Sequence, residues 1–197
     1  MKTTHTKLIG LTGAKGAGKD TVADHLEYMY NFKTMAFALP IKAALSAMHG
    51  VPISMFMDPL KKEVPQPKLL GRTPRFLMET MGTGWGRDMV DKDYWVNLLS
   101  LNARECLAAN VSVVVSDVRY DNEAQLVKDL GGEVWHIARG ETIYTPSDHS
   151  SEAGVSDQYI DFRIINDSTL RMLYTQIGVG LAKIARKRTG PNHNPTF

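Results

Sequence analysis

The chain has 197 residues, of which 43% are hydrophobic, and its formal net charge is only +2. This balance fits one large soluble domain and gives no argument for nucleic-acid binding. No apolar run approaches the about 18 residues of a membrane helix, and the one that follows residues 1–7 is too short for a signal peptide. The single cysteine, Cys106, cannot form an internal disulfide, so we expect a cytoplasmic protein.

The first motif lies near the N-terminus. An apolar run at 8–11 is followed by the pattern G-x-x-x-x-G-K-D-T and then by a helical pattern, which is the strand–loop–helix context of a P-loop. Glycines let backbone N–H groups approach an anion, the helix N-terminus points its dipole at the same place, and a lysine adds a full charge. The residues expected to bind the phosphates of ATP are Gly13, Ala14, Lys15, Gly16, Ala17, Gly18, Lys19, Asp20 and Thr21.

One position departs from the usual P-loop pattern. Asp20 stands where Ser or Thr normally ligates Mg²⁺, and Thr21 follows it. A carboxylate is a good hard-oxygen ligand, so we expect Asp20 to hold the metal directly or through water. The alternative, an ordinary glycine-rich turn with a surface lysine, does not explain the flanking strand and helix.

The next part of the chain is less regular. Residues 33–38 are predicted to form a second strand, and a helix follows from Leu39-Pro40. Between residues 50 and 71 four prolines interrupt the pattern, which indicates a mobile segment beside the core. The apolar residues 55–57 within it are expected to be exposed and would suit the interface of a homodimer.

A helix is predicted from Thr73 as N-cap, with Pro74 at its first position. Residues 82–87 hold three glycines and a tryptophan and are expected to form a shaped loop. A further helix is predicted from Trp95 to about Asn110.

The β-branched run at 111–116 predicts a central parallel strand. It ends in Asp117, and an apolar strand followed by Asp is the Walker-B pattern, in which the carboxylate holds Mg²⁺ or its water. The following helix is expected to be capped by Asp121 or Asn122. Further strands are predicted at 133–138 and 161–165, with a polar segment between them and a final amphipathic helix after residues 166–168.

Five strands alternating with helices predict an α/β fold, a three-layer domain with a five-stranded parallel sheet. Ligands bind beyond the C-terminal ends of the strands of such a sheet. The P-loop, Leu39-Pro40, the segment 117–119 and Arg139 all follow strands, so we expect them to converge on one cleft.

Phosphoryl transfer needs cations around the oxygens that share the transition-state charge. Arg119 is the strongest candidate because it follows the strand beside the P-loop, whereas Arg75 has an alternative partner in Glu79 four residues on. Any isolated arginine can instead be a solvated surface group or part of an ion pair. The candidates are Lys42, Arg72, Arg75, Arg87, Arg119 and Arg139.

Phe76, Trp85 and Trp95 are candidates for stacking on a base, and ordinary core positions for them are equally open. The polar segment 139–158 is interpreted as a lid that would exclude water from the phosphates. His149 and Glu152 in this segment have no further ligand at metal-binding spacing, so no metal site is predicted there.

Taken together, these stretches resemble phage-type deoxynucleoside monophosphate kinases, within the P-loop nucleoside monophosphate kinase group. The resemblance covers most of the chain in order, and its most specific parts are the P-loop with its aspartate and the Asp-Val-Arg stretch with the Asn-Glu that follows. The matching stretches are residues 13–21, 37–42, 73–79, 82–87, 116–124, 149–152 and 164–167.

The resemblance implies Mg²⁺-dependent transfer of the ATP γ-phosphoryl group to a deoxynucleoside 5′-monophosphate. It implies a single domain 1–197 with core segments 7–38, 111–138 and 160–188, an acceptor-binding region 39–95 and a lid 139–158. It places adenine near Asn166 and Asp167, and its 149–152 stretch puts Glu152 among the substrate-binding residues.

The resulting hypothesis assigns ATP phosphates to Lys19 and the loop amides, and Mg²⁺ to Asp20, Thr21 and Asp117. Lys19, Asp117 and Arg119 are the expected catalytic residues, and Asp117 could also orient the acceptor. The expected substrate-binding residues are Lys42, Arg72, Arg75, Trp85, Arg87, Trp95, Arg119 and Glu152. ATP and a deoxynucleotide are the expected partners, without nucleic acid or membrane; if the chain is phage-encoded, the location is the host cytoplasm.

Two rival functions remain at this point. One is another small-molecule P-loop kinase, such as one resembling dephospho-coenzyme A kinases. The other is a non-catalytic protein that uses ATP as a switch, against which the arginine-bearing segment 72–87 argues, because a switch needs no second phosphate pocket.

Overall fold

The computed structural model describes residues 7–140 and 154–189. The chain divides into two compact units, one formed by residues 1–34 with 111–197 and the other by residues 35–110. We call them the sheet unit and the helical unit. The helical unit includes the whole of the range 39–95 that the sequence assigned to acceptor binding; that assignment stays a prediction.

The sheet has five strands in the order β2-β3-β1-β4-β5. Strand β1 pairs in parallel with β3 and β4, and β4 pairs in parallel with β5. The predicted five-stranded parallel sheet is therefore confirmed. The strands are β1 (Leu8–Thr12), β2 (Lys33–Met35), β3 (Val113–Val115), β4 (Glu133–Ala138) and β5 (Ile160–Ile165).

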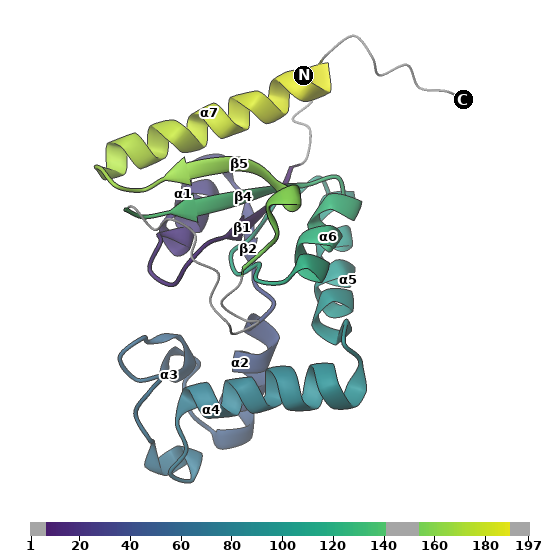
Figure 1. The fold of residues 1–197 in the computed structure, drawn as a ribbon. Helices are drawn as coiled ribbons and strands as arrows, with labels where there is room; N and C mark the ends of the chain where they lie inside the picture. Colours follow the sequence, from purple (N-terminus) through teal and green to yellow (C-terminus); the bar gives the residue numbers. More distant parts are fainter. Residues whose placement is uncertain (1–6, 141–153, 190–197) are drawn as a thin grey trace. The chain divides into compact units, whose positions relative to one another are not determined.

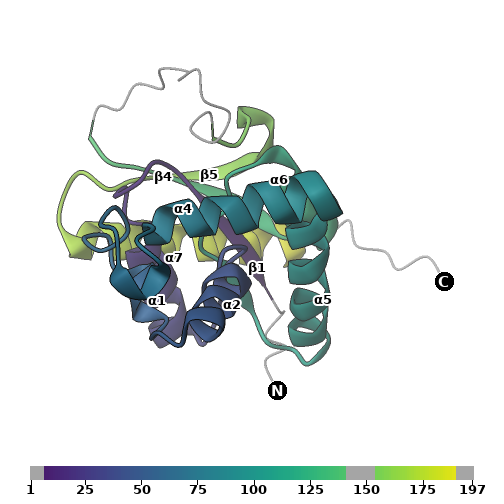
Figure 2. The ribbon, with the colours of Figure 1, turned by 90° about the horizontal axis from the view of Figure 1, so that it is seen from below.

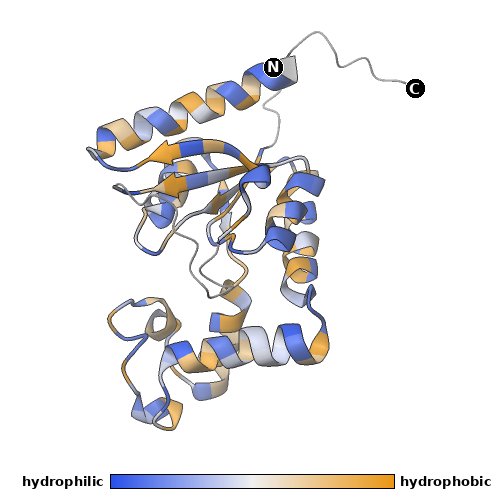
Figure 3. Ribbon diagram, in the orientation of Figure 1, coloured by the Kyte–Doolittle hydropathy of each residue, from blue (hydrophilic) through white to orange (hydrophobic). Residues whose placement is uncertain are grey.

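Helices cover both faces of this sheet (Figure 1). Helices α1 (Lys19–Tyr30) and α7 (Leu170–Thr189) share one hydrophobic core with Trp135 and Ile137 of β4, both fully buried. Helix α7 alternates hydrophobic and hydrophilic residues along its length (Figure 3), as its predicted apolar stripe requires. Burial of each large apolar side chain in this core contributes about 1.5–3 kcal/mol.

Helix α6 (Asp121–Asp129) packs on the other face, against β1 and β4. It lies so close that a Cβ atom at Gly10 would be 2.9 Å from the Val127 Cγ2 atom. The short turn η3 (Asp157–Tyr159) leads into β5. The sheet unit thus has the three layers expected from the sequence.

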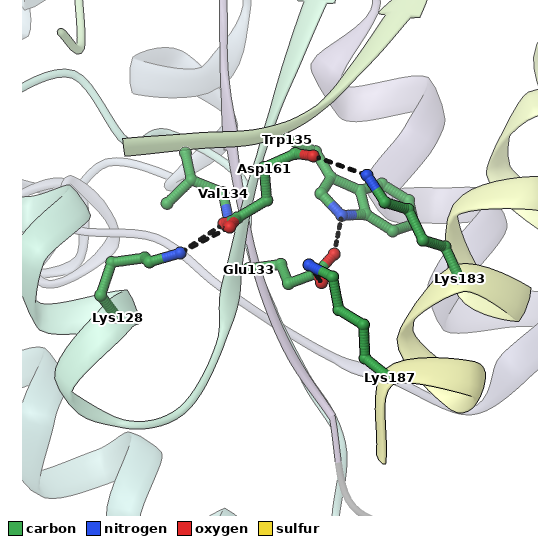
Figure 4. Close-up of polar contacts among 7 residues, drawn as sticks. All are labelled: Lys128, Glu133, Val134, Trp135, Asp161, Lys183 and Lys187. Atoms are coloured by element: carbon green, nitrogen blue, oxygen red, sulfur yellow. Dashed lines mark hydrogen bonds and ion pairs between the residues drawn. The ribbon is translucent and has the colours of Figure 1, made fainter. Parts of the chain in front are cut away.

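A network of ion pairs joins these layers where β4 and β5 begin (Figure 4). Lys128 of α6 lies 2.6 Å from the Asp161 carboxylate of β5, and Lys187 of α7 lies 2.8 Å from the Glu133 carboxylate of β4. Glu133 also accepts a hydrogen bond from Trp135 Nε1, and it raises the pKa of Lys187. Both carboxylates are therefore satisfied, and they attach α6 and α7 to the sheet.

The helical unit begins with short helices. It ends with two longer ones, the continuous helix made of α4 and η2, and α5. Thr73 Oγ1 accepts a hydrogen bond from Phe76 N at 3.1 Å, so the predicted N-cap is confirmed. Helix α4 runs directly into η2, and Figure 2 shows the two as one continuous helical rod. The elements are α2 (Leu39–His49), α3 (Ser54–Met57), the 3₁₀ turn η1 (Pro67–Leu69), α4 (Pro74–Glu79), the π-helix η2 (Thr80–Val90) and α5 (Tyr94–Ala108).

Two local predictions in this unit were wrong. Residues 82–87 form part of the π-helix η2 instead of a loop. Their glycines allow the indole of Trp95 to lie against the helix backbone, where its Nε1 donates to Gly82 O at 2.7 Å. Residues 55–57 are not an exposed apolar segment, because Phe56 is fully buried and only Met57 of the three is exposed.

Most of the segment predicted as a lid, with His149 and Glu152, lies outside the described residues. Among the helices of 7–140 and 154–189, none is long and apolar enough to cross a membrane.

Candidate active site

The glycine-rich loop joins β1 to α1 and takes a backbone path that side chains would block. Gly13 has a φ of 137°, and a Cβ atom there would lie 2.2 Å from Ile137 O. Gly18, the residue before α1, has a φ of 107°. Gly16 also has a positive φ, 79°, but no atom lies within 4 Å of its Cβ position. The loop is thus fixed at both ends and open in the middle, as an anion-binding loop must be.

Lys19, the first residue of α1, folds its side chain back over this loop. Its Nζ atom donates to Gly13 O at 2.6 Å and to Ala14 O at 2.9 Å. Burial lowers the pKa of Lys19, and the charge of Arg119 lowers it further, while Asp20 and Asp117 act in the opposite direction. These interactions place Lys19, Asp20, Asp117 and Arg119 in one electrostatic neighbourhood, as the sequence predicted for the strand ends.

Asn166, directly after β5, is bound to the same loop. Its side-chain Nδ2 donates to Ala17 O at 2.9 Å, and its backbone N donates to Ala138 O at 2.7 Å. A Cβ atom at Gly18 would lie 2.4 Å from Asn166 Nδ2, so the glycine makes this contact possible. The expected contact of Asn166 and the exposed Asp167 with adenine stays a prediction, and the observed role of Asn166 is to hold the loop.

The turn between Asp117 and α6 is held by the carboxylate of Glu123, for which no role was predicted. Glu123 is 2% exposed, and its Oε2 accepts from Arg119 N at 2.7 Å and from Tyr120 N at 3.3 Å. This is the capping-box arrangement, whose sequence signal is a glutamate three residues after the cap position. Glu123 thereby fixes the backbone from which the Arg119 side chain extends.

The residue predicted to cap α6 was wrong. The cap position is Tyr120, ahead of both Asp121 and Asn122. The Asp121 carboxylate instead accepts hydrogen bonds from Ser156 N at 2.8 Å and Ser156 Oγ at 2.6 Å. The Asp121 carboxylate therefore binds Ser156, which is distant in the sequence, and does not cap its own helix. No local sequence pattern indicates this partner.

A second residue missing from the prediction is His136 of β4. It is the register neighbour of Thr12 on β1 and of Arg163 on β5, so these polar residues form a row across the sheet at the level of the loop. Burial lowers the pKa of His136, the charges of Arg163 and Lys19 lower it further, and Asp157 partly offsets them. In the sequence, His136 could have been noticed as a polar residue within an apolar strand.

Two carboxylates in the electrostatic neighbourhood of Lys19 have the chemistry of magnesium ligands. In nucleotide sites Mg²⁺ uses one or two carboxylates together with phosphate oxygens and water. Asp20 and Asp117 both act on the charge of Lys19, and Thr21 follows Asp20 on the first turn of α1. Over 7–140 and 154–189 no group of three or more His, Cys, Asp or Glu side chains is assembled for a metal, and the pair of carboxylates fits Mg²⁺ held jointly with phosphates.

Several of the lysines and arginines predicted to bind substrate lie in the helical unit. Arg75 forms ion pairs with Glu63 and with Glu79, and Glu63 is the main cause of its raised pKa. The alternative pairing of Arg75 with Glu79 is therefore present, together with a pairing that spacing did not predict. Arg72 lies over the Phe76 ring, with 5.3 Å between the guanidinium carbon and the ring centroid.

The remaining candidates differ in exposure. Arg87 Nη1 donates to Lys92 O at 3.3 Å. Trp85 is 43% exposed, whereas Trp95 is only 6% exposed. Lys42 is half-buried on α2, and Arg139 is exposed after the end of β4.

Comparison with known proteins gives one family. A model of the family described as deoxynucleotide monophosphate kinase matches residues 72–177. The chain is 33% identical over 181 residues to a candidate deoxynucleotide monophosphate kinase of Acanthamoeba polyphaga mimivirus, which covers 86% of this chain and 93% of that protein. It is 34% identical over 104 residues to the deoxynucleotide monophosphate kinase of Escherichia phage RB69, a match that spans 52% of this chain and 42% of the phage protein.

Solved structures with the same fold include other kinases. A gluconokinase from Sinorhizobium meliloti 1021 has a TM-score of 0.51 at 15% identity, covering 96% of this chain and 99% of that one. A dephospho-CoA kinase from Campylobacter jejuni has a TM-score of 0.50 at 14% identity, covering 92% and 98%. At these identities the likeness shows the fold alone.

Proposed function

Because the chain belongs to the deoxynucleotide monophosphate kinase family, we propose that it transfers the ATP γ-phosphoryl group to a deoxynucleoside 5′-monophosphate. The products are the deoxynucleoside diphosphate and ADP. The observation that carries this proposal is the loop between β1 and α1, with Lys19 drawn over it and Asp117 and Arg119 in its electrostatic neighbourhood. Such a loop is the structural requirement for holding the phosphates of a nucleotide.

The loop and Lys19 bind the β- and γ-phosphates of ATP. In the present structure the Lys19 ammonium donates to two loop carbonyls, Gly13 O and Ala14 O. Phosphate oxygens are stronger acceptors for a cation than carbonyls are, so nucleotide binding would draw Nζ from these carbonyls toward the phosphates. The added negative charge would also counter the burial that lowers the pKa of Lys19.

Arg119 stabilises the phosphoryl group during transfer, and Asp117 orients the acceptor. Transfer passes through a loose transition state with charge on the equatorial oxygens, so positioned cations matter more than a general base. Glu123 holds the Arg119 backbone in place for this role.

Asp20, Thr21 and Asp117 would hold Mg²⁺ next to the phosphates. When bound, the ion would supply positive charge that neutralises the phosphates. The protein's own part is to place two carboxylates beside the lysine so that metal and phosphates are bound together.

Acceptor binding falls to the helical unit, with Lys42, Arg72, Arg75 and Arg87 for the monophosphate and Trp85 for the base. To bind a phosphate, Arg75 would have to contact it in addition to Glu63 and Glu79, or in place of them. A phosphate dianion competes well for a guanidinium that is already oriented by side-chain carboxylates.

Arg139, Asn166 and Asp167 complete the nucleotide site, and Glu152 is assigned to substrate binding. The reaction belongs in the cytoplasm, where ATP and deoxynucleotides are available. A homodimer would be compatible with this function; of the segment 55–57 only Met57 is exposed.

The direct test is a panel of deoxynucleoside monophosphates with ATP, with and without Mg²⁺, measured as acceptor-dependent ADP release. We expect turnover with at least one deoxynucleotide, and a loss of about 10²–10³-fold or more in the Lys19→Ala variant, because the main charge on the phosphates is removed. Lys33→Ala is the matched control, since Lys33 is an exposed lysine of the same unit outside the loop.

Full turnover by Lys19→Ala would contradict the proposed mechanism. Preference for dephospho-coenzyme A over every deoxynucleotide would instead favour the rival kinase. ATP binding without acceptor-dependent turnover would favour a nucleotide switch.

A further inference from the structure

The π-helix η2 is an unusual element, because π-helical segments are rare, mostly single turns, and frequent at functional sites. Here it spans eleven residues, Thr80–Val90, and carries Trp85 and Arg87, two of the residues proposed to bind the acceptor. Its shape is held by a side chain of the next helix.

Trp95 of α5 supplies this support. The side chain is 6% exposed, and its Nε1 donates to Gly82 O at 2.7 Å, near the start of η2. One turn later, the indole lies against Gly86 so closely that a Cβ atom there would be 2.4 Å from Nε1 and 2.7 Å from Cε2. The indole therefore contacts the backbone of η2 at two positions, and at Gly86 it leaves no room for a side chain.

The same aromatic group extends to Trp85. The ring of Tyr94 lies edge-on to Trp95 with centroids 4.9 Å apart, and edge-on to Trp85 with centroids 5.3 Å apart. The rings of Trp85 and Trp95 are 6.1 Å apart. Trp85 therefore packs against Tyr94 and Trp95 on one side, while 43% of its surface is exposed.

Helix type decides where these side chains point. Successive residues of an α-helix turn by about 100°, and those of the wider π-helix turn by less, so a change from π to α geometry within η2 would rotate the later side chains progressively around the axis. Arg87 follows Gly86 directly and donates to Lys92 O. Its direction therefore depends on the backbone that Trp95 holds.

We propose that Trp95 is a positioning residue for the acceptor: its indole fixes the π-helical backbone at Gly82 and Gly86 and so sets the directions of Trp85 and Arg87. This inference rests on the proposed kinase function and gives Trp95 a role through its neighbours in place of direct contact with the substrate. A displacement of about 1 Å in such groups can reduce turnover by about 10²-fold.

The test compares two alanine substitutions in the same helix. Gly86→Ala places a methyl group in the indole, whereas Gly84→Ala meets no atom within 4 Å. Both replace a glycine of η2 that has no positive φ, so the change in backbone preference is shared. We expect Gly86→Ala to raise the KM for the deoxynucleotide by about tenfold or more and to leave the KM for ATP within about twofold. Gly84→Ala should leave both KM values within about twofold.

Trp95→Phe is the second variant, because it keeps an aromatic ring but removes the donor to Gly82 O. It should raise the deoxynucleotide KM selectively, and it decides the question if Gly86→Ala does not fold. The positioning role is overturned if Gly86→Ala and Gly84→Ala have the same deoxynucleotide KM, or if the KM values for both substrates rise together. Absence of deoxynucleotide-dependent turnover in the wild-type chain would overturn the proposed function itself.

Discussion

Glu123 lies in the first turn of α6 and is almost completely buried. Its Oε2 accepts from the backbone N atoms of Arg119 and Tyr120. A charged acceptor makes these bonds worth about 1.5–3 kcal/mol each, compared with about 1 kcal/mol for a neutral amide. The residue therefore contributes to stability and to the position of Arg119 at the same time.

We predict that Glu123→Gln lowers the free energy of unfolding by about 1–2 kcal/mol, because the acceptor remains but its charge is lost. Glu123→Ala should cost about 3 kcal/mol, since two N–H groups then lose their buried partner. Denaturant unfolding of each variant gives these values. Asp24→Asn, at an exposed position on α1, should be close to neutral, and equal stability of all three variants would contradict the role given to Glu123.

His136 gives the chain a dependence of stability on pH. The folded pKa of His136 lies below the ordinary value of 6.5, mainly because of burial and secondly because of Arg163. The unfolded chain therefore binds the proton first as the pH falls. The stability linked to this histidine is complete above about pH 6.5 and is lost as the pH falls from there toward the lower folded pKa.

We predict that His136→Gln flattens the decline in unfolding free energy between about pH 7 and pH 5.5, measured by denaturant titration at each pH. His25→Gln should act in the same direction, because burial also lowers the pKa of His25. The double variant should flatten the curve further. Parallel curves for wild type and His136→Gln would show that the folded site accepts the proton without cost.

At the scale of elements, the glycines of the phosphate loop have different functions. Gly13 needs its positive φ and also faces Ile137 O, whereas Gly16 needs only the positive φ because its Cβ position is open. An alanine in a left-handed conformation costs about 1–2 kcal/mol, and a clash with a backbone carbonyl cannot be relieved by a side-chain rotation.

We therefore predict that Gly16→Ala lowers stability by about 1–2 kcal/mol, a Tm decrease of roughly 2–8 °C for a chain of this size. Gly13→Ala should lower Tm much further and weaken ATP binding, because the loop must move from Ile137. Calorimetry for Tm and for ATP binding distinguishes the two variants. Equal effects would mean that the loop can shift at Gly13 without penalty.

Another element, η2, shows where local patterns fail. Three glycines within 82–87 predict a loop, since glycine lowers helix stability in isolation. In the folded chain the absence of a side chain at Gly86 is what allows the Trp95 indole to lie against the helix. The glycines were interpreted as forming a loop, but the residue that packs against them lies in the next helix, and its packing sets the structure.

On the scale of the whole molecule, the alternation of strands and helices was sufficient to predict the parallel sheet. The strongest strand prediction, at 111–116, is confirmed as β3, an interior strand between β2 and β1, although only Val113–Val115 pair as a strand. Strand order was not predictable from the pattern, because periodicity describes which face is buried and not which strand lies next to which.

The candidate site was predictable where consecutive residues carry the chemistry. The loop 13–21 and the strand end at Asp117 are local patterns, and the structure places Lys19 and Asp117 in one electrostatic neighbourhood of the sheet unit. The contact of Asn166 with Ala17 O joins residues 149 positions apart, and the pairing of Arg75 with Glu63 joins residues 12 positions apart. No local spacing indicates such pairs.

The sequence alone determined the fold class, because the alternation of strand and helix patterns carries a physical requirement, and its resemblance to known kinases indicated the family. The glycine-rich loop lies between β1 and α1, as its pattern predicted. Tertiary structure alone decided which side chains do the positioning: Glu123 beneath Arg119, Asn166 on the loop, and Trp95 against η2. The physical reason is that a hydrogen bond or a close contact depends on distance in space. The chain specifies that distance only after its core has formed.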